Sequence, residues 1–286
     1  MDLHLRKQHL ELDRPLVMGI VNVTPDSFFD GGQYYDPQRA VAHALRLVAE
    51  GADLLDIGAE STRPGALPVD EHEERRRLLP VVTAVARAVS VPISVDTSKA
   101  EVARAALDAG AVMVNDVTAL RGDRAMVDVV AEAGAGLVVM HMQGIPETMQ
   151  QAPHYDDVVG DVAQFLAERS RFAMDHGVER DRIVLDPGIG FGKTLTHNLD
   201  LLANLHAFTE LGFPLLVGPS RKGFIGQLTH QSVDARAWGT AAVIALAVQQ
   251  GARILRVHDV GPMRDVVSVA DAVARRMRTT AREQHA

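Results

Sequence analysis

Eight short apolar runs recur along the chain, separated by longer stretches of a different periodicity. The runs cover residues 16–21, 54–57, 93–95, 111–114, 137–140, 183–185, 215–217 and 254–257. They are too short for buried helices and lack strict alternation with polar residues, a pattern typical of strands covered on both faces. The pattern therefore predicts eight buried strands.

The stretches between these runs are amphipathic and predict helices. The clearest span residues 40–50, 98–109, 156–176 and 234–250. Several helices are expected to end at a glycine in the position of a C-cap, namely Gly51, Gly110, Gly212 and Gly251. Eight βα units in 286 residues match the usual size of a (β/α)8, or TIM, barrel of the α/β class. The number of units alone also allows a doubly wound open sheet.

No linker or low-complexity segment divides the chain. The two stretches rich in glycine and proline, residues 63–68 and 186–192, follow predicted strands and do not separate domains. We therefore expect one domain over residues 1–286, with a barrel core from about 15 to 275.

Composition narrows the class of protein. With 47% hydrophobic and 23% charged residues the chain can bury a large core, and the absence of cysteine excludes disulfides and cysteine-bound metals. The net charge of -8 argues against a nonspecific nucleic-acid binder. No run approaches the roughly 20 apolar residues of a membrane span, and the start does not look like a signal peptide. A cytoplasmic protein without nucleic-acid or membrane partners is expected.

Polar side chains gather where the predicted strands end. They include Asn22, Asp56, Ser61, Thr62, Arg63, Asp96, Asn115, Asp116, His141, Asp186, Ser220, Arg221, Lys222, Arg256 and His258. A single polar residue after a strand is ordinary loop or capping chemistry. In a barrel, however, the carboxyl ends of all strands meet on one face and build the active site, so the full set indicates a site there.

Several common chemistries find no support in the sequence. It contains neither a Gly-x-Ser-x-Gly nucleophile elbow nor a His-Glu-x-x-His zinc motif. The segment 188–194 looks like a phosphate-binding P-loop, but only three residues separate Gly188 from Gly192 where a P-loop has four. We interpret this segment as a tight βα loop.

The polar residues divide into two groups with different chemistry. Arg63, Arg256 and His258, together with Thr62 and Asn22, are suited to a cationic cup for a phosphate or diphosphate. Asp96, Asn115, Asp186 and Lys222 are suited to a flat heterocycle with many donors and acceptors. Taken singly, Asp186 could be a turn residue and Arg256 part of a structural ion pair. The residues alone predict an anionic, ring-containing ligand and go no further.

At these positions the sequence resembles the dihydropteroate synthase family. The similar segments are residues 18–28, 30–32, 51–65, 94–97, 115–116, 140–144, 186–193, 220–222 and 256–258, in the family's order. The resemblance runs from about residue 15 to 275. Each segment alone is moderately specific, whereas all of them in register are very specific.

The resemblance implies a role for each matching residue. The pterin would be held by Asp96, Asn115, Asp186 and Lys222, and the diphosphate by Arg63, Arg256 and His258. The expected catalytic residues are Asp96, Asp186, Lys222, Arg63, Arg256 and His258. Asn22 would help to bind Mg²⁺ and diphosphate. Thr62, Pro64, Phe191 and Ser220 would flank the pocket for 4-aminobenzoate. The loops 24–36 and 63–70 would close over the substrates.

The implied reaction joins 6-hydroxymethyl-7,8-dihydropterin diphosphate to 4-aminobenzoate. The implied assembly is a homodimer through late barrel helices such as residues 235–250.

One position departs from the family, because Gly223 stands where a serine commonly follows Ser220-Arg221-Lys222. Two other functions are weighed: a pterin-binding methyltransferase, which has no use for a diphosphate cup, and a non-catalytic pterin-binding homologue.

Overall fold

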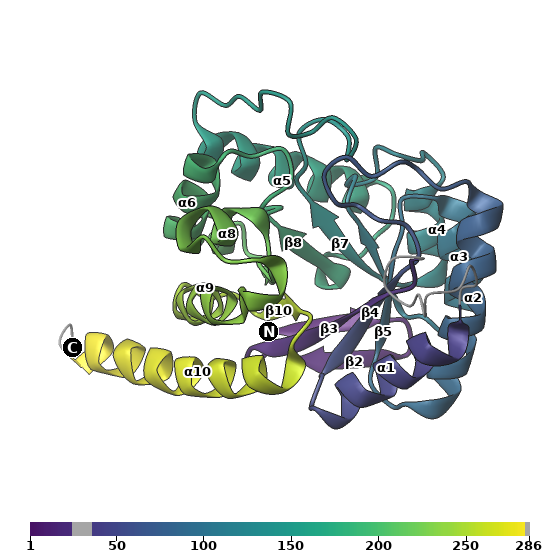
Figure 1. Ribbon diagram of the computed structural model, residues 1–286, viewed down its shortest axis with the longest axis horizontal. Coiled ribbons are helices and arrows are strands. Elements are labelled where there is room, and N and C mark those ends of the chain that lie inside the picture. Colours follow the sequence, from purple (N-terminus) through teal and green to yellow (C-terminus); the bar gives the residue numbers. More distant parts are fainter. Residues whose placement is uncertain (25–35, 284–286) are drawn as a thin grey trace.

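Eight parallel strands form a closed barrel in the computed structural model, which describes residues 1–24 and 36–283 (Figure 1). The barrel strands are β3 (Leu16–Asn22), β4 (Leu54–Gly58), β5 (Ile93–Asp96), β6 (Met113–Asp116), β7 (Gly136–Met140), β8 (Ile183–Asp186), β9 (Leu216–Val217) and β10 (Ile254–Val257). They are hydrogen-bonded in the order β8-β7-β6-β5-β4-β3-β10-β9, and a parallel bridge between Leu185 and Leu215 closes the ring. The predicted (β/α)8 barrel and its eight strands are confirmed.

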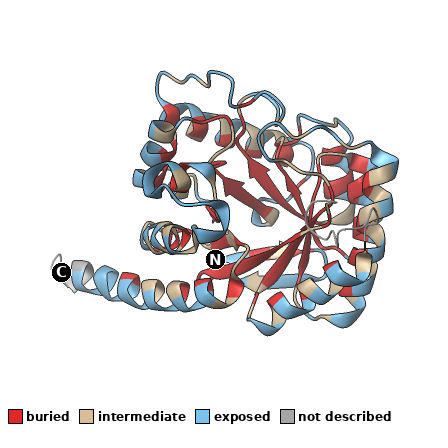
Figure 2. Cartoon of the chain, viewed as in Figure 1, coloured by how far each residue is buried: buried red, intermediate tan, exposed pale blue. Residues whose placement is uncertain are grey.

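Helices surround this barrel and cover the outer faces of its strands (Figures 1 and 2). They are α1 (Pro37–Ala49), α2 (Glu71–Ala88), α3 (Ala100–Asp108), α4 (Met126–Ala133), α5 (Val158–Asp175), α6 (Leu195–Ala203), α7 (His206–Thr209), α8 (Gly223–Thr229), α9 (Ala237–Gln249) and α10 (Val260–Glu283), with short 3₁₀ turns at Arg180–Arg182 and Val233–Ala235. No helix among the described residues is both long and apolar enough to cross a membrane.

Glycines end several of these helices, as the sequence predicts. Gly51, Gly110, Gly212 and Gly251 all have positive φ angles between 76° and 118°. At Gly110 a Cβ would lie only 2.7 Å from that of Ala86. A side chain there would therefore meet both backbone strain and a close neighbour.

The barrel interior is layered. Alternate strand residues point inward. The inward layer nearer the amino ends of the strands, called the lower end here, consists of apolar side chains: Leu16, Met18, Leu54, Met113, Val138, Val184, Leu216 and Ile254. Two residues further along the strands, the inward positions carry polar groups such as Asp56, Asn115, Asp186 and Arg256. The apolar layer thus forms a dry floor beneath the polar one.

An N-terminal hairpin, which the sequence did not indicate, closes the lower end of the barrel. Strands β1 (Asp2–Leu5) and β2 (Gln8–Glu11) pair antiparallel, and Leu3 and Leu5 are completely buried against the apolar layer. The hairpin lies ahead of the stretch expected to form the core. Each strand is only four residues long, which is too short for polar–apolar alternation to be a clear signal.

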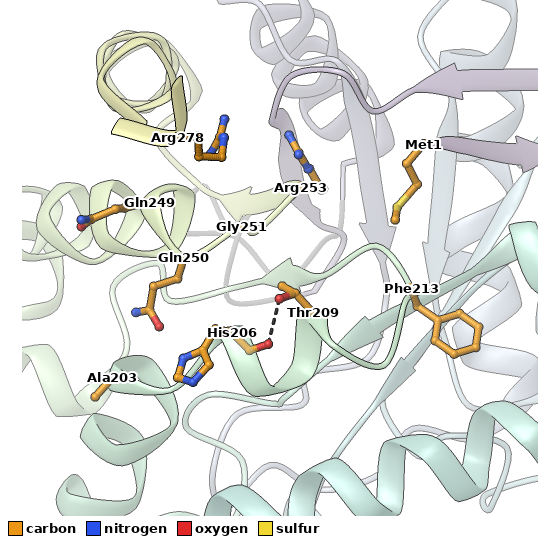
Figure 3. Close-up of a pocket in the computed structure, with 10 residues that line it drawn as sticks. All are labelled: Met1, Ala203, His206, Thr209, Phe213, Gln249, Gln250, Gly251, Arg253 and Arg278. Atoms are coloured by element: carbon orange, nitrogen blue, oxygen red, sulfur yellow. Dashed lines mark hydrogen bonds between the residues drawn. The ribbon is translucent and has the colours of Figure 1, made fainter. Parts of the chain in front are cut away.

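A cavity of about 730 Å³ opens at the same lower end (Figure 3). Its lining includes Met1, His206, Gly251, Arg253 and Arg278. Arg253 directly precedes β10, so this cavity lies at the opposite end of that strand from Arg256. None of the predicted site residues lines it, and the chemistry must be sought at the carboxyl ends of the strands.

Candidate active site

The polar residues predicted from the strand ends come together inside the upper half of the barrel. Asp96 and Asp186 are the last residues of β5 and β8, Asn115 lies in β6, and Arg256 lies in β10. Asp96, Asn115 and Asp186 are all less than 9% exposed. Their shared inward orientation follows from strand parity and from the parallel register of the barrel.

Arg256 connects three of the strands through its guanidinium group. Its Nε donates to Asp56 Oδ2 over 2.6 Å, and its Nη2 donates to Asp96 Oδ2 over 2.8 Å. The amide of Asn115 donates to the same oxygen of Asp56 over 3.0 Å. One arginine therefore bridges two buried carboxylates.

This bridge decides the charge states in the site. Burial raises the pKa of Asp96, and Asp56 raises it further, while Arg256 opposes both. Burial lowers the pKa of Arg256, but Asp56 and Asp96 outweigh that effect, so its pKa is raised overall. The other oxygen of Asp56, Oδ1, is buried and has no hydrogen-bond partner among the described residues. Arg256 thus stays cationic, and one acceptor remains unsatisfied.

Asp186 and Lys222 are a carboxyl group and an amine that influence each other electrostatically. Asp186 Oδ1 accepts a 2.7 Å hydrogen bond from the backbone of Gly188. Burial raises the pKa of Asp186, while Lys222 and the Gly188 hydrogen bond act to lower it. Burial also lowers the pKa of Lys222 to about 7, although Asp186 acts in the opposite direction. Donor and acceptor side chains are therefore placed close together in a poorly hydrated part of the site.

Lys222 also contacts the loop that follows β8. Its amine donates to the carbonyl of Ile189 and lies 4.2 Å from the centre of the Phe191 ring. Phe191 packs in turn against a small apolar cluster of Val117, Met140, Met142 and Met149. The structure therefore places Phe191 directly beside the lysine expected to hold the pterin.

His258 and Ser220 are hydrogen-bonded to each other. The hydroxyl of Ser220 lies 2.9 Å from His258 Nδ1 and accepts from the backbone N–H of His258 over 3.1 Å. Burial lowers the pKa of His258 to about 3, and the nearby Arg256 and Arg221 add to the effect. His258 is consequently neutral at pH 7, so the positive charge of the cup comes from its arginines.

Arg221 has a structural role between Ser220 and Lys222. Its φ is +57°, and its guanidinium forms two hydrogen bonds, of 2.6 and 3.0 Å, with Asp259. Its backbone N–H donates to Thr240. These contacts turn the chain sharply, so that Ser220 and Lys222 both reach the barrel mouth.

The remaining predicted residues lie at the rim. Thr62, Arg63 and Pro64 belong to the loop between β4 and α2, where Arg63 and Pro64 are exposed. Arg63 is near enough to act electrostatically on His258. Asn22 ends β3 opposite Gly58. Among the described contacts, no side-chain hydrogen bond joins these four residues to the buried layer.

Two loops were expected to close over the site. In the second, residues 63–70, Gly65 donates to the carbonyl of Pro146 over 3.0 Å. Thr62, beside it, lines a cavity of about 590 Å³ formed by the loops after β4 to β7. Most of the first, residues 24–36, lies outside the described residues, as do the glycines 31 and 32.

Some important residues received no role from the sequence. Asp56 was recognised only as a polar residue at a strand end, yet it anchors both Arg256 and Asn115. His141 and Lys193 lie in the similar segments, but their direct contact over 3.0 Å was not foreseen. The alternation of side chains along a strand could have indicated Asp56, because it lies two residues after the inward-facing Leu54. The contact between His141 and Lys193 has no signal in the sequence.

Taken together, these observations define an α/β barrel with buried polar groups and arginines at the carboxyl ends of its strands, the face on which enzymes of this fold carry their active sites. The profile of the family described as "Pterin binding enzyme" matches residues 18–258. The dihydropteroate synthase of Escherichia coli (strain K12) is 46% identical over 95% of this chain and 96% of its own.

Solved structures agree with this comparison. The dihydropteroate synthase of Xanthomonas albilineans with 4-aminobenzoic acid superposes with a TM-score of 0.90 at 51% identity, covering 95% of this chain and 97% of its own. The same enzyme in complex with 7,8-dihydropteroate gives 0.87 at 48% identity, covering 96% and 98%. The chain belongs to the dihydropteroate synthase family of pterin-binding enzymes.

The low pKa of His258 predicts a pH dependence of stability. Below pH 6.5 the unfolded chain binds a proton at this histidine, whereas the folded protein does so only near pH 3, so stability is lost as the pH falls between these values. From pH 7 to pH 5 the wild type should lose about 2 kcal/mol more unfolding free energy than His258→Gln. Urea unfolding at both pH values measures this difference. The exposed His72→Gln serves as control, and identical losses in wild type and His258→Gln would contradict the assignment.

Proposed function

We propose that this protein condenses 6-hydroxymethyl-7,8-dihydropterin diphosphate with 4-aminobenzoate, giving 7,8-dihydropteroate and diphosphate. The observation that carries the proposal is the polar layer formed by the buried Asp96, Asn115 and Asp186 with the partly buried Lys222, beside the cation Arg256. The family relationship supports it, since relatives at almost half identity over nearly the whole chain are dihydropteroate synthases.

The buried layer is suited to the pterin. An aminopyrimidinone edge offers two parallel N–H donors, which a carboxylate such as Asp186 can accept together. Lys222 and the amide of Asn115 supply donors for ring nitrogens and the carbonyl. The N–H groups of a bound pterin would also favour ionised carboxylates, which burial alone disfavours.

The diphosphate would lie nearer the mouth. Arg256 stays cationic, Arg63 is exposed at the rim, and His258 contributes a neutral imidazole. Arginine favours phosphate oxygens because its planar donors bind them in pairs. These groups would stabilise the negative charge that develops as diphosphate leaves, each good contact contributing about 2–4 kcal/mol.

Mg²⁺ is proposed as a cofactor that is held mainly by the substrate. Among the described residues, no group of three or more His, Asp or Glu side chains could hold a metal. This fits Mg²⁺, which commonly takes one or two protein oxygens and completes its shell with phosphate and water. The amide oxygen of Asn22, at the end of β3, would be the ligand from the described residues. When bound, Mg²⁺ would neutralise charge on the diphosphate.

The 4-aminobenzoate site would be built by Thr62, Pro64, Phe191 and Ser220 near the surface. Gly223, where the family commonly has serine, begins α8 and is exposed. No atom lies within 4 Å of the position that a Cβ would take there. The glycine is therefore not required by packing, and the serine hydroxyl is a contact that this chain lacks.

The chemistry needs no protein nucleophile. The C–O bond between the pterin methylene and diphosphate breaks, the arylamine nitrogen bonds to that carbon, and the amine loses one proton. Positive charge that develops on the methylene is delocalised into the pterin and favoured by the nearby Asp96 and Asp186. Positioning of the two substrates and preorganised charge then supply most of the rate.

The two other functions receive less support. A methyltransferase would have no use for the diphosphate cup, yet Arg63, Arg256 and His258 are all present at the barrel mouth. A non-catalytic pterin-binding homologue would be expected to lose parts of this cup. Release of diphosphate separates both from the proposed enzyme.

A homodimer is also proposed, through the neighbouring helices α9 and α10 (Figure 1). Helix α9 contains no charged residue, a composition typical of a helix buried on all sides. Yet Trp238 and Leu246 on α9 are 87% and 55% exposed, and Val273 on α10 is 55% exposed. A second copy of the chain would cover this apolar surface.

The reaction is tested by incubating the protein with both substrates and Mg²⁺ and measuring dihydropteroate and diphosphate. Wild type should form both products in equal amounts, and EDTA should suppress them. Asp186→Asn should lower kcat/KM by about 10²-fold or more, because the amide removes an acceptor for the pterin edge. Asp200→Asn, an exposed change of the same kind on α6, should have no effect. Pterin binding without any product would overturn the proposal.

Dimer formation is tested by sedimentation velocity of wild type and Leu246→Glu. The wild type should sediment at twice its 30.9 kDa mass, and the buried charge should shift the variant toward monomer by raising the dissociation constant at least about tenfold. Leu45→Glu, on the exposed side of α1, is the matched control. A wild-type monomer at micromolar concentration would refute the dimer.

A further inference from the structure

Lys193 is a buried lysine that the reaction described above does not use. It follows the β8 loop and is only 3% exposed. Its amine lies 3.0 Å from His141 Nδ1, donates to the carbonyl of Phe191 over 3.0 Å, and lies 3.5 Å from the carbonyl of His141. An ammonium group has three donors, and three acceptors surround this one.

The histidine partner is suited to accept. Burial lowers the pKa of His141 to about 2, and the nearby Lys193 contributes to this shift. The imidazole is therefore neutral, and its Nδ1 can accept a hydrogen bond from the lysine amine. Burial lowers the pKa of Lys193 itself to about 7, while Asp186 acts to raise it. Leaving such a group in the interior is costly, so its retention calls for a function.

The loop that Lys193 holds, residues 187–192, approaches its neighbours very closely. A Cβ on Gly188 would lie 1.9 Å from the carbonyl oxygen of His141, and one on Gly190 would lie 2.9 Å from Lys222 Cδ. Both glycines have positive φ angles, 67° and 84°. The loop is thus pressed between the end of β7 and Lys222, and its position fixes what Lys222 can touch.

Two active-site contacts depend directly on this loop. The carbonyl of Ile189 accepts a hydrogen bond from Lys222, and the ring of Phe191 lies 4.2 Å from the same amine. The carbonyl of Phe191 is one of the three acceptors around Lys193. Through Phe191, Lys193 is therefore linked to the groups that are expected to contact the two substrates, the Phe191 ring and Lys222.

We propose that Lys193 is a positioning residue for the condensation. Its amine joins the carbonyl of Phe191 to His141 at the end of β7, and thereby sets the Phe191 ring and the Ile189 carbonyl beside Lys222. The inference rests on the proposed function. Without the amine, the loop would shift, the reacting atoms would be misaligned, and the 4-aminobenzoate pocket would lose one wall.

The test uses the absence of cysteine in this chain. Lys193→Cys introduces a single thiol, which can be alkylated in denaturant before refolding. Aminoethylation creates a side chain that ends in an ammonium group, and propylation creates one of equal length that ends in a methyl group. The two proteins differ at this one position only in the charged donor.

The aminoethyl protein should recover kcat/KM to within about threefold of wild type. The propyl protein should remain about 10- to 100-fold lower, as expected for a misplaced reacting group. Its KM for 4-aminobenzoate should rise more than its KM for the pterin diphosphate, because two of the four residues expected to hold the pterin, Asp96 and Asn115, lie on strands that Lys193 does not touch.

Two results would overturn the proposal. Equal kcat/KM for the two alkylated proteins would show that the amine is not needed. A fall in kcat with both KM values unchanged would indicate only a smaller folded fraction. If neither protein refolds, Lys193→Met folded in the cell decides the matter by the same KM comparison. Should wild type form no product, the proposed function fails separately, and calorimetric affinity for 4-aminobenzoate then compares the two alkylated proteins.

Discussion

The contact of Arg256 with Asp56 and Asp96 is the interaction on which the site depends. The cation Arg256 and two carboxyl groups lie inside the barrel, where an ionised group would be costly to bury alone. The hydrogen bonds of 2.6 and 2.8 Å use two of the guanidinium's donors and join strands β4, β5 and β10. The remaining acceptor, Asp56 Oδ1, has no partner among the described residues. These contacts preorganise the site.

The rest of the barrel keeps this layer in place and dry. Apolar side chains and the N-terminal hairpin close the barrel below it, and Leu3 and Leu5 are fully buried there. Water is thereby kept from the underside of the charges, which strengthens their interactions. On the side of β7 and β8, Lys193 holds the loop that carries Phe191. The polar layer is therefore supported from below and from the side, whereas Arg63 is exposed at the rim.

The sequence predicted the features that repeat and missed those that depend on single contacts. Eight apolar runs predict the barrel, and the position of Asp96, Asn115, Asp186 and Arg256 at predicted strand ends indicates a site at its carboxyl face. The hairpin was missed because strands of four residues carry too little pattern. The role of Asp56 and the contact of Lys193 with His141 require the distances between strands that are far apart in sequence. The sequence also could not predict charge states, since burial and the neighbouring Arg256 and Arg221 together lower the pKa of His258.

The measurement that tests this account most directly is the steady-state kinetics of Asp56→Asn, a change that preserves shape and removes one charge. If the buried bridge organises the site, the variant should fold and show a kcat/KM for the pterin diphosphate about 10²-fold below wild type, because Arg256 loses the charge of one of its two carboxyl partners. A folded Asp56→Asn protein with wild-type kcat/KM would contradict the central role of this bridge.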